Sequence, residues 1–384
     1  MKHYIKADAF YYPYQIKPAG YLEVCDGRFG SWFSQVPDDG EILDYTGYQV
    51  APGLVDTHVH GYAGADVMDL KTDSLYQMSQ HLLETGVTSF LPTGLTASFE
   101  DLNQVCQMVA EVAGTETGAR IQGLYFEGPY FTEKYKGAQN PKYMRNPSKE
   151  ELDTWLASSQ GWLKKIAVAP EREGVEDFVA YAKSKGLVVA LGHSDATFEE
   201  ATRAVEAGAT VWVHAYNGMS GLNHREPGMV GAVYELPNTY AELICDGYHV
   251  HPSACDILLR QKGHNHVALI TDCMSAGGLE DGDYMLGEYP VVVSNGTARL
   301  KEGGSLAGSI LKLKDGLKNI VDWGLASPLE AVRMASFIPA LSMKIEEQCG
   351  QLKKGLPADF IILDSELNLC ATYLAGQVVS QISS

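Results

Sequence analysis

Features that would place the chain in a membrane or outside the cell are scarce in the sequence. No apolar run approaches the roughly 18 residues that span a bilayer, and residues 1–8 lack the apolar core of a signal peptide. The seven cysteines are odd in number and are never spaced as Cys-x-x-Cys, which favours reduced thiols over disulfides. We therefore expect a cytoplasmic protein.

Positive charge is also in short supply. The chain carries 29 Lys and Arg against 48 Asp and Glu, which gives a formal net charge of −19. This charge balance argues against nucleic acid and anionic membrane surfaces as partners, because both are themselves negatively charged. If the substrate is an anion, a local cluster of cationic groups must hold it.

From residue 51 onward the sequence alternates between strands and amphipathic helices. About eight strand–helix units follow one another, the number that closes a TIM (β/α)8 barrel of parallel strands. A doubly wound open sheet is the alternative, but no Gly-x-Gly-x-x-Gly follows the first strand. The expected strands are 54–59, 87–92, 121–126, 166–169, 188–191, 211–214, 241–244 and 266–271. The expected helices are 72–84, one capped by Ser98, 175–185, 198–207, 252–261, 310–323 and 328–336.

Both ends of the chain differ from this α/β pattern. Residues 1–50 and 345–384 are rich in short strand patterns separated by turn residues. We expect the two ends to form one small β-sandwich domain beside a barrel that occupies residues 51–344. The sequence also predicts a β-hairpin insert near 287–300, around Asn295-Gly296.

The strand 54–59 ends in a His-x-His pair. Side chains of a strand alternate between its faces, so His58 and His60 point into the same volume, as a metal site requires. Two unrelated histidines in a surface turn are the alternative, and the pair alone decides little between them.

Other metal-binding residue types also follow predicted strands. Glu127 ends the third strand, His193 the fifth, His214 the sixth and Asp272 the eighth. The active site of a TIM barrel lies at these carboxyl ends, and one Glu with two His is a recurring hydrolytic zinc arrangement. A carboxylate such as Asp272 beside a metal can accept a proton and later return it. The alternatives are a structural Arg partner for Glu127 and a purely structural Asp272.

Arg225 lies in the loop after the sixth strand, in the sequence His224-Arg225-Glu226-Pro227-Gly228. Its guanidinium could hold a phosphate or carboxylate through two hydrogen bonds. A salt bridge to Glu226 or to another acid of the loop is an equal alternative. His249, after the seventh strand, is a second candidate for the anion site.

Taken together, these motifs resemble those of the N-acetylglucosamine-6-phosphate deacetylases, a family of the amidohydrolase superfamily. The resemblance extends across the barrel and the flanking β segments. The motifs that carry it are PGLVDTHVHG (52–61), FEGP (126–129), LGHS (191–194), HAYNGM (214–219), REPG (225–228), DGYH (246–249) and TD (271–272).

The resemblance implies metal-dependent hydrolysis of N-acetyl-D-glucosamine 6-phosphate to D-glucosamine 6-phosphate and acetate. It implies a divalent metal, one or two ions of Zn, Fe, Mn or Co, with the first held by Glu127, His193 and His214. Asp272 would act as general base and then as general acid. Because this chain has both histidines of the His-x-His pair, we expect a second ion at His58 and His60, bridged by Glu127.

The same resemblance implies a homodimer in which Arg225 reaches the sugar phosphate in the neighbouring subunit's site. Gln139 stands where some family members carry a His that polarises the acetyl carbonyl; its amide can donate a hydrogen bond but carries no charge. The residues implied to line the substrate pocket are Ala138, Gln139, Asn217, Gly218, His249, Leu306, Ala307 and Gly308.

Two other functions compete with this interpretation. The first is an amidohydrolase that acts on a cyclic amide or an N-acyl amino acid, as dihydroorotases or D-aminoacylases do. Dihydroorotase-like members usually bridge their metals with a carboxylated Lys, whereas the corresponding strand here offers Glu127. The second is a barrel without catalysis that senses a sugar phosphate or serves as a scaffold, although this chain keeps every expected ligand.

Overall fold

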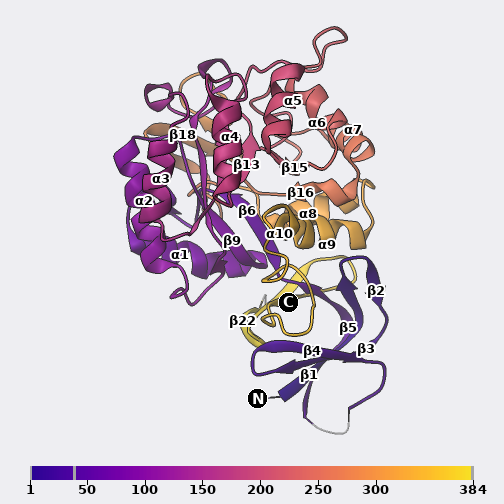
Figure 1. Ribbon diagram of the computed structural model, residues 1–384. Helices are drawn as coiled ribbons and strands as arrows, with labels where there is room; N and C mark the ends of the chain where they lie inside the picture. Colours follow the sequence, from indigo (N-terminus) through magenta and orange to yellow (C-terminus); the bar gives the residue numbers. More distant parts are fainter. Residues whose placement is uncertain (1, 38–39, 382–384) are drawn as a thin grey trace.

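The structure is a computed structural model that describes residues 2–37 and 40–381, and it consists of a barrel with a separate β-sheet beside it (Figure 1). Adjacent barrel strands are parallel. The barrel strands are β6 (Leu54–Val59), β9 (Val87–Gly94), β11 (Leu124–Tyr130), β12 (Leu163–Val168), β13 (Val188–Leu191), β14 (Val211–Trp212), β15 (Tyr240–Leu243) and β16 (Val267–Leu269). A short strand, β10 (Arg120–Ile121), pairs with β9.

The first strand and the segment after the last strand close the barrel. Val59 pairs in parallel with Cys273, and the amide of Asp272 donates to the carbonyl of His58 at 2.9 Å. The predicted TIM barrel is therefore confirmed, and the open doubly wound sheet is wrong.

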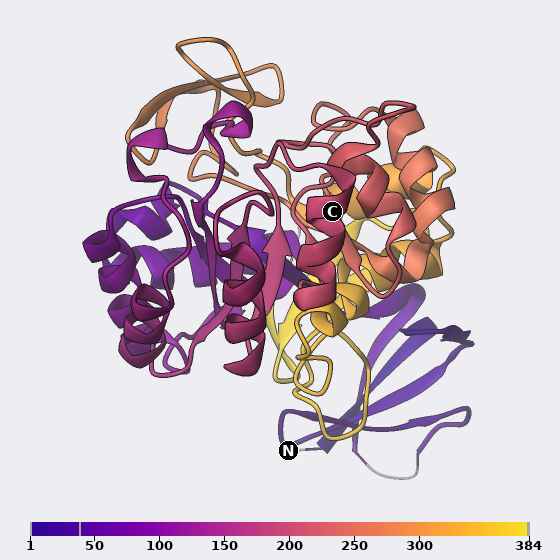
Figure 2. The ribbon, with the colours of Figure 1, turned by 45° about the horizontal axis from the view of Figure 1, so that its top comes forward.

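Helices surround the barrel (Figure 2). Ser98 caps α2 as predicted, and Gly86, with φ +80°, ends the first helical segment. The helices are α1 (Thr72–Leu82), α2 (Phe99–Val112), α3 (Lys149–Ser158), α4 (Val175–Ser184), α5 (Phe198–Ala207), α6 (Gly228–Glu235), α7 (Pro252–Lys262), α8 (Leu313–Asp322), α9 (Pro328–Ala335) and α10 (Phe337–Ser342). Short 3-10 turns lie at Val67–Asp69, Leu83–Thr85, Glu133–Tyr135, Pro141–Tyr143 and His264–His266.

Sequence reasoning missed three of these helices, α3, α6 and α10. Glycine in α6 and a proline in α10 lower their intrinsic helix propensity, and both helices form because their apolar residues are buried against neighbouring elements. In α3, Ser148 provides the N-cap and Trp155 is fully buried. Tertiary packing thus outweighs local propensity in these segments.

Strands from both chain ends form one eight-stranded sheet, as expected for the joint β domain. Its order is β22-β21-β20-β5-β1-β3-β4, with β2 paired to β1, so it is one continuous sheet. Its strands are β1 (Lys2–Tyr12), β2 (Gln15–Lys17), β3 (Gly20–Cys25), β4 (Arg28–Phe33), β5 (Glu41–Pro52), β20 (Phe360–Leu363), β21 (Leu369–Leu374) and β22 (Gln377–Gln381).

The sheet joins the barrel where β5 runs into β6 through Gly53. A Cβ at Gly53 would lie 2.0 Å from the hydroxyl of Thr88, so only glycine allows this close approach. The amide of Gly53 donates to the carbonyl of Asp359, whose carboxylate also binds Arg120 of the barrel at 2.7 Å. These contacts hold the two parts together.

A small antiparallel sheet lies above the barrel rim (orange in Figure 2). It contains the predicted hairpin, β18 (Tyr289–Ser294) and β19 (Thr297–Leu300), and β17 (Gly282–Leu286) adds a strand that was not predicted. A two-stranded ribbon, β7 (Gly61–Tyr62) and β8 (Ala65–Asp66), follows β6. Within the described ranges, no helix is long and apolar enough to cross a membrane.

Candidate active site

Glu127 lies in the middle of β11, His193 and His214 follow the carboxyl ends of β13 and β14, and the three side chains meet. One carboxylate oxygen, Glu127 Oε1, lies 3.0 Å from His193 Nε2 and 2.9 Å from His214 Nε2. The two imidazole nitrogens are 3.1 Å apart. All three side chains are almost completely buried, so their donor atoms converge on one small volume.

Backbone carbonyls determine which nitrogen of each ring faces this volume. His193 Nδ1 lies 2.8 Å from the carbonyl of Tyr135, and His214 Nδ1 lies 3.1 Å from that of Asn217. A carbonyl oxygen can only accept, so each Nδ1 carries a proton and donates it. Each Nε2 therefore faces Glu127 and, once it gives up its proton, offers a lone pair that can bind a metal.

The second group consists of His58, His60, Glu127 and Asp272. His60 Nε2 lies 3.1 Å from Glu127 Oε2 and 3.0 Å from Asp272 Oδ1. His58 Nε2 is 3.6 Å from Glu127 Oε1 and 3.5 Å from Asp272 Oδ1. Glu127 therefore contributes an oxygen to each group and lies between them.

Strained backbone presents three of these side chains. His193, His214 and Asp272 have φ values of +46°, +29° and +52°, directly after their strands. Residues other than glycine rarely adopt this left-handed region, and such strain gathers at functional sites. Here it turns each side chain over the mouth of the barrel.

A buried ion pair lies beneath His58 and was not found from the sequence. Glu242 of β15 accepts from His58 Nδ1 at 3.1 Å, and its other oxygen forms a short contact with Lys165 Nζ of β12. Both Glu242 and Lys165 are fully or nearly fully buried, and the ammonium lies 3.8 Å from the centre of the Tyr125 ring. The only sequence signal is a charged residue within each of two mostly buried strands, Lys165 in β12 and Glu242 in β15.

Carboxylates dominate the electrostatics of this site. Burial favours the neutral form of Glu127, but the positive charge of His58 and the hydrogen bonds of nearby imidazoles outweigh it and hold the pKa well below its usual value. Burial likewise opposes ionisation of Asp272, yet His58 and His60 lower its pKa below the usual value. Both groups are anionic at neutral pH and require positive charge close by.

The donor set fits a divalent cation. Carboxylate oxygens and imidazole Nε2 atoms are the ligands of Zn, Fe, Mn and Co sites, and the crowded negative charge favours a cation. In each of two groups the possible ligand atoms lie within 4.8 Å of one another. The groups are Glu127, His193 and His214, and His58, His60, Glu127 and Asp272.

A pocket opens over the metal-binding groups. Most of the predicted substrate residues line it: Ala138, Gln139, Asn217, Gly218, His249, Leu306 and Gly308. Sequence reasoning did not identify three further lining residues, Leu95, Gly137 and Leu286. They belong to loops and to the small sheet, where no motif distinguishes them.

Gln139 faces the metal-binding groups directly. Its Nε2 donates to Glu127 Oε2 at 2.6 Å, and its Oε1 accepts from the amide of Thr96 at 2.8 Å. The second contact fixes which end of the amide is the donor, so the N–H group points towards Glu127. A substrate carbonyl would have to compete with Glu127 for this donor.

Two of the predicted substrate residues do not line the pocket of this single chain. Ala307 is fully buried and packs in the apolar core under the small sheet. Arg225 is exposed, and across the described residues its side chain forms no hydrogen bond or ion pair, so the suggested salt bridge to Glu226 is absent. His249, in contrast, is held at the pocket by Asp246, 2.6 Å from its Nδ1.

Comparison with known proteins identifies the family of the chain and several relatives. Residues 49–380 match the amidohydrolase family. The chain is 45% identical to the N-acetylglucosamine-6-phosphate deacetylase of Vibrio furnissii, covering 85% of this chain and 82% of that protein. It is 41% identical to the N-acetylgalactosamine-6-phosphate deacetylase of Escherichia coli O157:H7, covering 86% and 88%.

A solved structure covers almost the whole chain. It is an aspartate-to-alanine mutant of the N-acetyl-D-glucosamine-6-phosphate deacetylase of Mycobacterium smegmatis, in complex with N-acetyl-D-glucosamine-6-phosphate. It superposes with a TM-score of 0.94 at 29% identity, over 99% of this chain and 100% of that one.

Proposed function

Because the chain belongs to the amidohydrolase family, and within it to the N-acetylglucosamine-6-phosphate deacetylases, we propose that it hydrolyses N-acetyl-D-glucosamine 6-phosphate to D-glucosamine 6-phosphate and acetate. The observation that carries the proposal is the convergence of Glu127, His193, His214 and Asp272 on one pocket. Neither the cyclic-amide hydrolase nor the non-catalytic sensor has comparable support.

The first metal position would be held by Glu127, His193 and His214, and the second by His58 and His60 with Glu127 shared between them. A bound divalent ion acts as a Lewis acid and makes water a nucleophile near neutral pH. Replacing His58 and His60 together should remove one ion per subunit and leave the other, as measured by elemental analysis. Loss of both ions, or of neither, would contradict two separate positions.

Asp272 is the proposed general base and acid. It lies at the pocket and is ionised at neutral pH, so it can accept a proton from the attacking water. The same proton then goes to the departing nitrogen, which leaves as the amine when the amide C–N bond breaks. Asp272→Asn should lower kcat by about 10²–10⁴-fold. Near-normal turnover with metal and substrate still bound would exclude this role.

The phosphate is proposed to bind near Asn217, Gly218 and His249, with Arg225 supplied by the other subunit of a homodimer. Arg225 is exposed and its side chain has no partner within the described chain, so it is available for that contact. Mixed dimers test this proposal, since Arg225→Ala and Asp272→Asn subunits together should regain activity that each homodimer lacks. Failure to regain activity, in a sample shown to contain mixed dimers, would place Arg225 outside the neighbouring site.

Acetate release tests the proposed reaction itself. The protein, loaded in turn with Zn, Fe, Mn or Co, is assayed with N-acetylglucosamine 6-phosphate and with the unphosphorylated sugar. We expect turnover of the phosphorylated sugar to dominate; equal rates would overturn the phosphate argument. N-acetylgalactosamine 6-phosphate is the third substrate, because one close relative is named for it.

A further inference from the structure

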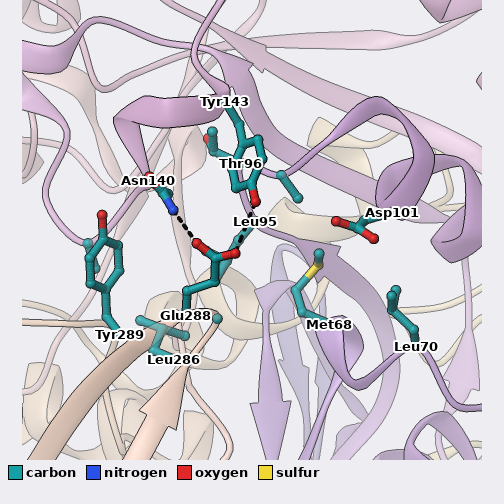
Figure 3. A pocket seen from close by; sticks show the side chains of 13 residues that line it. Met68, Leu70, Leu95, Thr96, Asp101, Asn140, Tyr143, Leu286, Glu288 and Tyr289 are labelled. Carbon is teal, nitrogen blue, oxygen red and sulfur yellow. Dashed lines mark hydrogen bonds between the residues drawn. The ribbon is translucent and has the colours of Figure 1, made fainter.

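A second cavity adjoins the catalytic pocket on the side of β9 (Figure 3). It encloses about 200 Å³ and shares three lining residues with the catalytic pocket, Leu95, Ala138 and Leu286. Leu95 and Leu286 are buried, with 6% and 1% of their surface exposed. The two cavities therefore adjoin at a boundary lined by these side chains, two of which are leucines.

The lining of the second cavity combines apolar and polar side chains. Its apolar lining includes Met68 and Leu70, and Figure 3 shows Glu288 bonded to Asn140 and Tyr143 in its polar part. Glu288 accepts from Asn140 at 2.5 Å and from Tyr143 at 2.9 Å. These bonds tie the β17–β18 turn to the loop after β11, so the cavity has a defined wall.

The barrel order gives the direction in which a substrate would point. Leu95 follows β9, the second barrel strand, whereas Asn217 and His249 follow β14 and β15, the sixth and seventh strands, across the barrel. In an acylated amino sugar the carbonyl carbon lies between the sugar nitrogen and the acyl chain. If the sugar phosphate lies on the β14–β15 side, as the proposed function requires, the acyl chain extends from the metal-binding groups towards Leu95.

We propose that this second cavity is an acyl annex, which takes N-acyl chains longer than acetyl on the same amino sugar phosphate. The inference rests on the proposed function and extends its substrate range. Water adds its hydroxyl to the acyl carbon and its proton to the nitrogen as the C–N bond breaks, so the products are glucosamine 6-phosphate and the corresponding fatty acid. No cofactor beyond that of the deacetylation is required.

The charge of the annex defines which chains it accepts. None of its lining residues is a Lys or Arg, and two, Asp101 and Glu288, are carboxylates. A chain that ends in a carboxylate would meet like charge in a partly buried space. The annex therefore suits uncharged chains such as propanoyl, butanoyl and hexanoyl, and excludes succinyl.

A substrate series tests the annex in the metal-loaded protein. The kcat/KM is measured for glucosamine 6-phosphate carrying N-acetyl, N-propanoyl, N-butanoyl, N-hexanoyl or N-succinyl groups. In an apolar pocket that fits acetyl and is closed beyond it, one added methylene would lower kcat/KM by roughly 10–200-fold. We expect the propanoyl and butanoyl substrates to stay within about tenfold of acetyl, and the succinyl substrate to fall far below butanoyl.

Variants connect the series to the two cavities. Leu95→Ala should widen the connection between the two cavities and raise the hexanoyl-to-acetyl ratio of kcat/KM by about tenfold or more. Met68→Trp should fill the annex and lower this ratio while the acetyl substrate is still hydrolysed. Leu279→Ala is the matched control for the leucine truncation, because Leu279 is 43% exposed and lines neither cavity. It should leave the ratio unchanged.

The outcomes separate the annex from the function on which it rests. Absence of turnover with every substrate, acetyl included, would overturn the proposed function. Normal acetyl turnover with a steep loss at propanoyl, unchanged by Leu95→Ala, would overturn the annex alone. The annex is equally excluded if the Leu279→Ala control shifts the ratio as much as Leu95→Ala does, since the effect would then not be specific to the cavity.

Discussion

Each imidazole of the candidate active site uses one ring nitrogen for the protein and leaves the other for the site. The Nδ1 atoms of His60, His193 and His214 meet backbone carbonyls, and that of His58 meets the carboxylate of Glu242. These partners fix the tautomer and the orientation of the rings. Glu242 also accepts from the backbone amide of His214 at 3.3 Å, so it contacts residues of both metal-binding groups.

The pair of Lys165 and Glu242 gives the first prediction at this scale. Glu242→Gln alone leaves a buried ammonium without its counterion, which costs about 3–5 kcal/mol of stability. Lys165→Met with Glu242→Gln removes both charges but keeps an acceptor for His58, whereas Lys165→Met with Glu242→Leu removes the acceptor as well. The free energy of unfolding should recover in both double variants.

Metal affinity should follow a different order from stability. Affinity at the His58–His60 position should fall from the native protein to the Gln double variant and then to the Leu double variant, by about 10–100-fold in total. Titration calorimetry with Zn and Mn measures this order. If affinity recovers together with stability in both double variants, Glu242 serves the fold and not the metal position.

Metal binding should depend on pH in a direction set by His58. Burial opposes its protonation most strongly, but Glu127, Asp272 and Glu242 outweigh burial and raise the pKa of His58 to about 9. A metal ion must displace this proton, so affinity should increase from pH 6.5 to 9, and calorimetry in buffers of different ionisation enthalpy should detect proton release.

The stability of the metal-free protein should change in the opposite direction. Because the pKa of His58 is about 9 in the folded chain and 6.5 is its usual value, the protonated form stabilises the fold fully below pH 6.5. This contribution is lost as the pH rises through 9. The Tm of metal-free protein should therefore decrease over this range, and His58→Asn should flatten the curve. A Tm that increases in the native protein would contradict the assignment.

At the scale of secondary structure, the ends of elements carry the chemistry. β6, β11, β13, β14 and β16 are short and buried; β11 carries Glu127 within the strand, and each of the others brings a His or Asp to its carboxyl end or just beyond. The small sheet β17–β19 then adds Leu286 above them, so that one wall of the pocket comes from outside the barrel. The small sheet packs on its own apolar cluster, and its β17–β18 turn is also bonded to the loop after β11.

Glu288 is the contact to test in this wall. Glu288→Ala removes both hydrogen bonds that tie the β17–β18 turn to Asn140 and Tyr143. Because the turn packs against the pocket rather than the barrel core, we expect KM to rise several-fold. Tm should change little, because exposed polar contacts contribute only about 0–1 kcal/mol. Tyr143→Phe, which removes one of the two bonds, should have a smaller effect. A large loss of Tm with unchanged KM would show a structural role only.

At the scale of the whole molecule, the barrel depends on a sheet that needs both chain ends. β20 pairs with β5 next to the start of the barrel, and Asp359 joins three segments there. Its carboxylate accepts from Arg120 at 2.7 Å and from the amide of Ala375 at 2.7 Å, while its carbonyl accepts from Gly53. The junction is largely shielded, since only 7% of the Asp359 side chain is exposed.

Asp359→Ala should therefore lower the free energy of unfolding by about 1–3 kcal/mol, because it leaves Arg120 and the partly buried amide of Ala375 unpaired. Asp283→Ala is the matched control, since Asp283 forms an ion pair with Lys301 in which both side chains are exposed. The control should cost less than about 1 kcal/mol. Urea unfolding compares the two, and equal losses would rule out a special role for the junction.

The sequence alone was sufficient for the barrel architecture and for which side chains gather at its rim. The alternation of strands and helices predicted the barrel, and the polar residue after each strand predicted Glu127, His193, His214 and Asp272. These inferences succeed because they are local: in a parallel barrel every strand ends at the same rim, so the order along the chain determines which side chains meet.

The tertiary structure decided what depends on contacts between distant segments. Lys165 and Glu242 are 77 residues apart, and nothing local marks them as partners. The acyl annex needs the β17–β18 turn to pack against the loops after β9 and β11, and α6 and α10 are helical through burial rather than propensity. Such features arise only when the closed barrel brings these segments into contact. The free energy that stabilises them comes from burial and pairing between distant segments, and not from interactions between neighbouring residues.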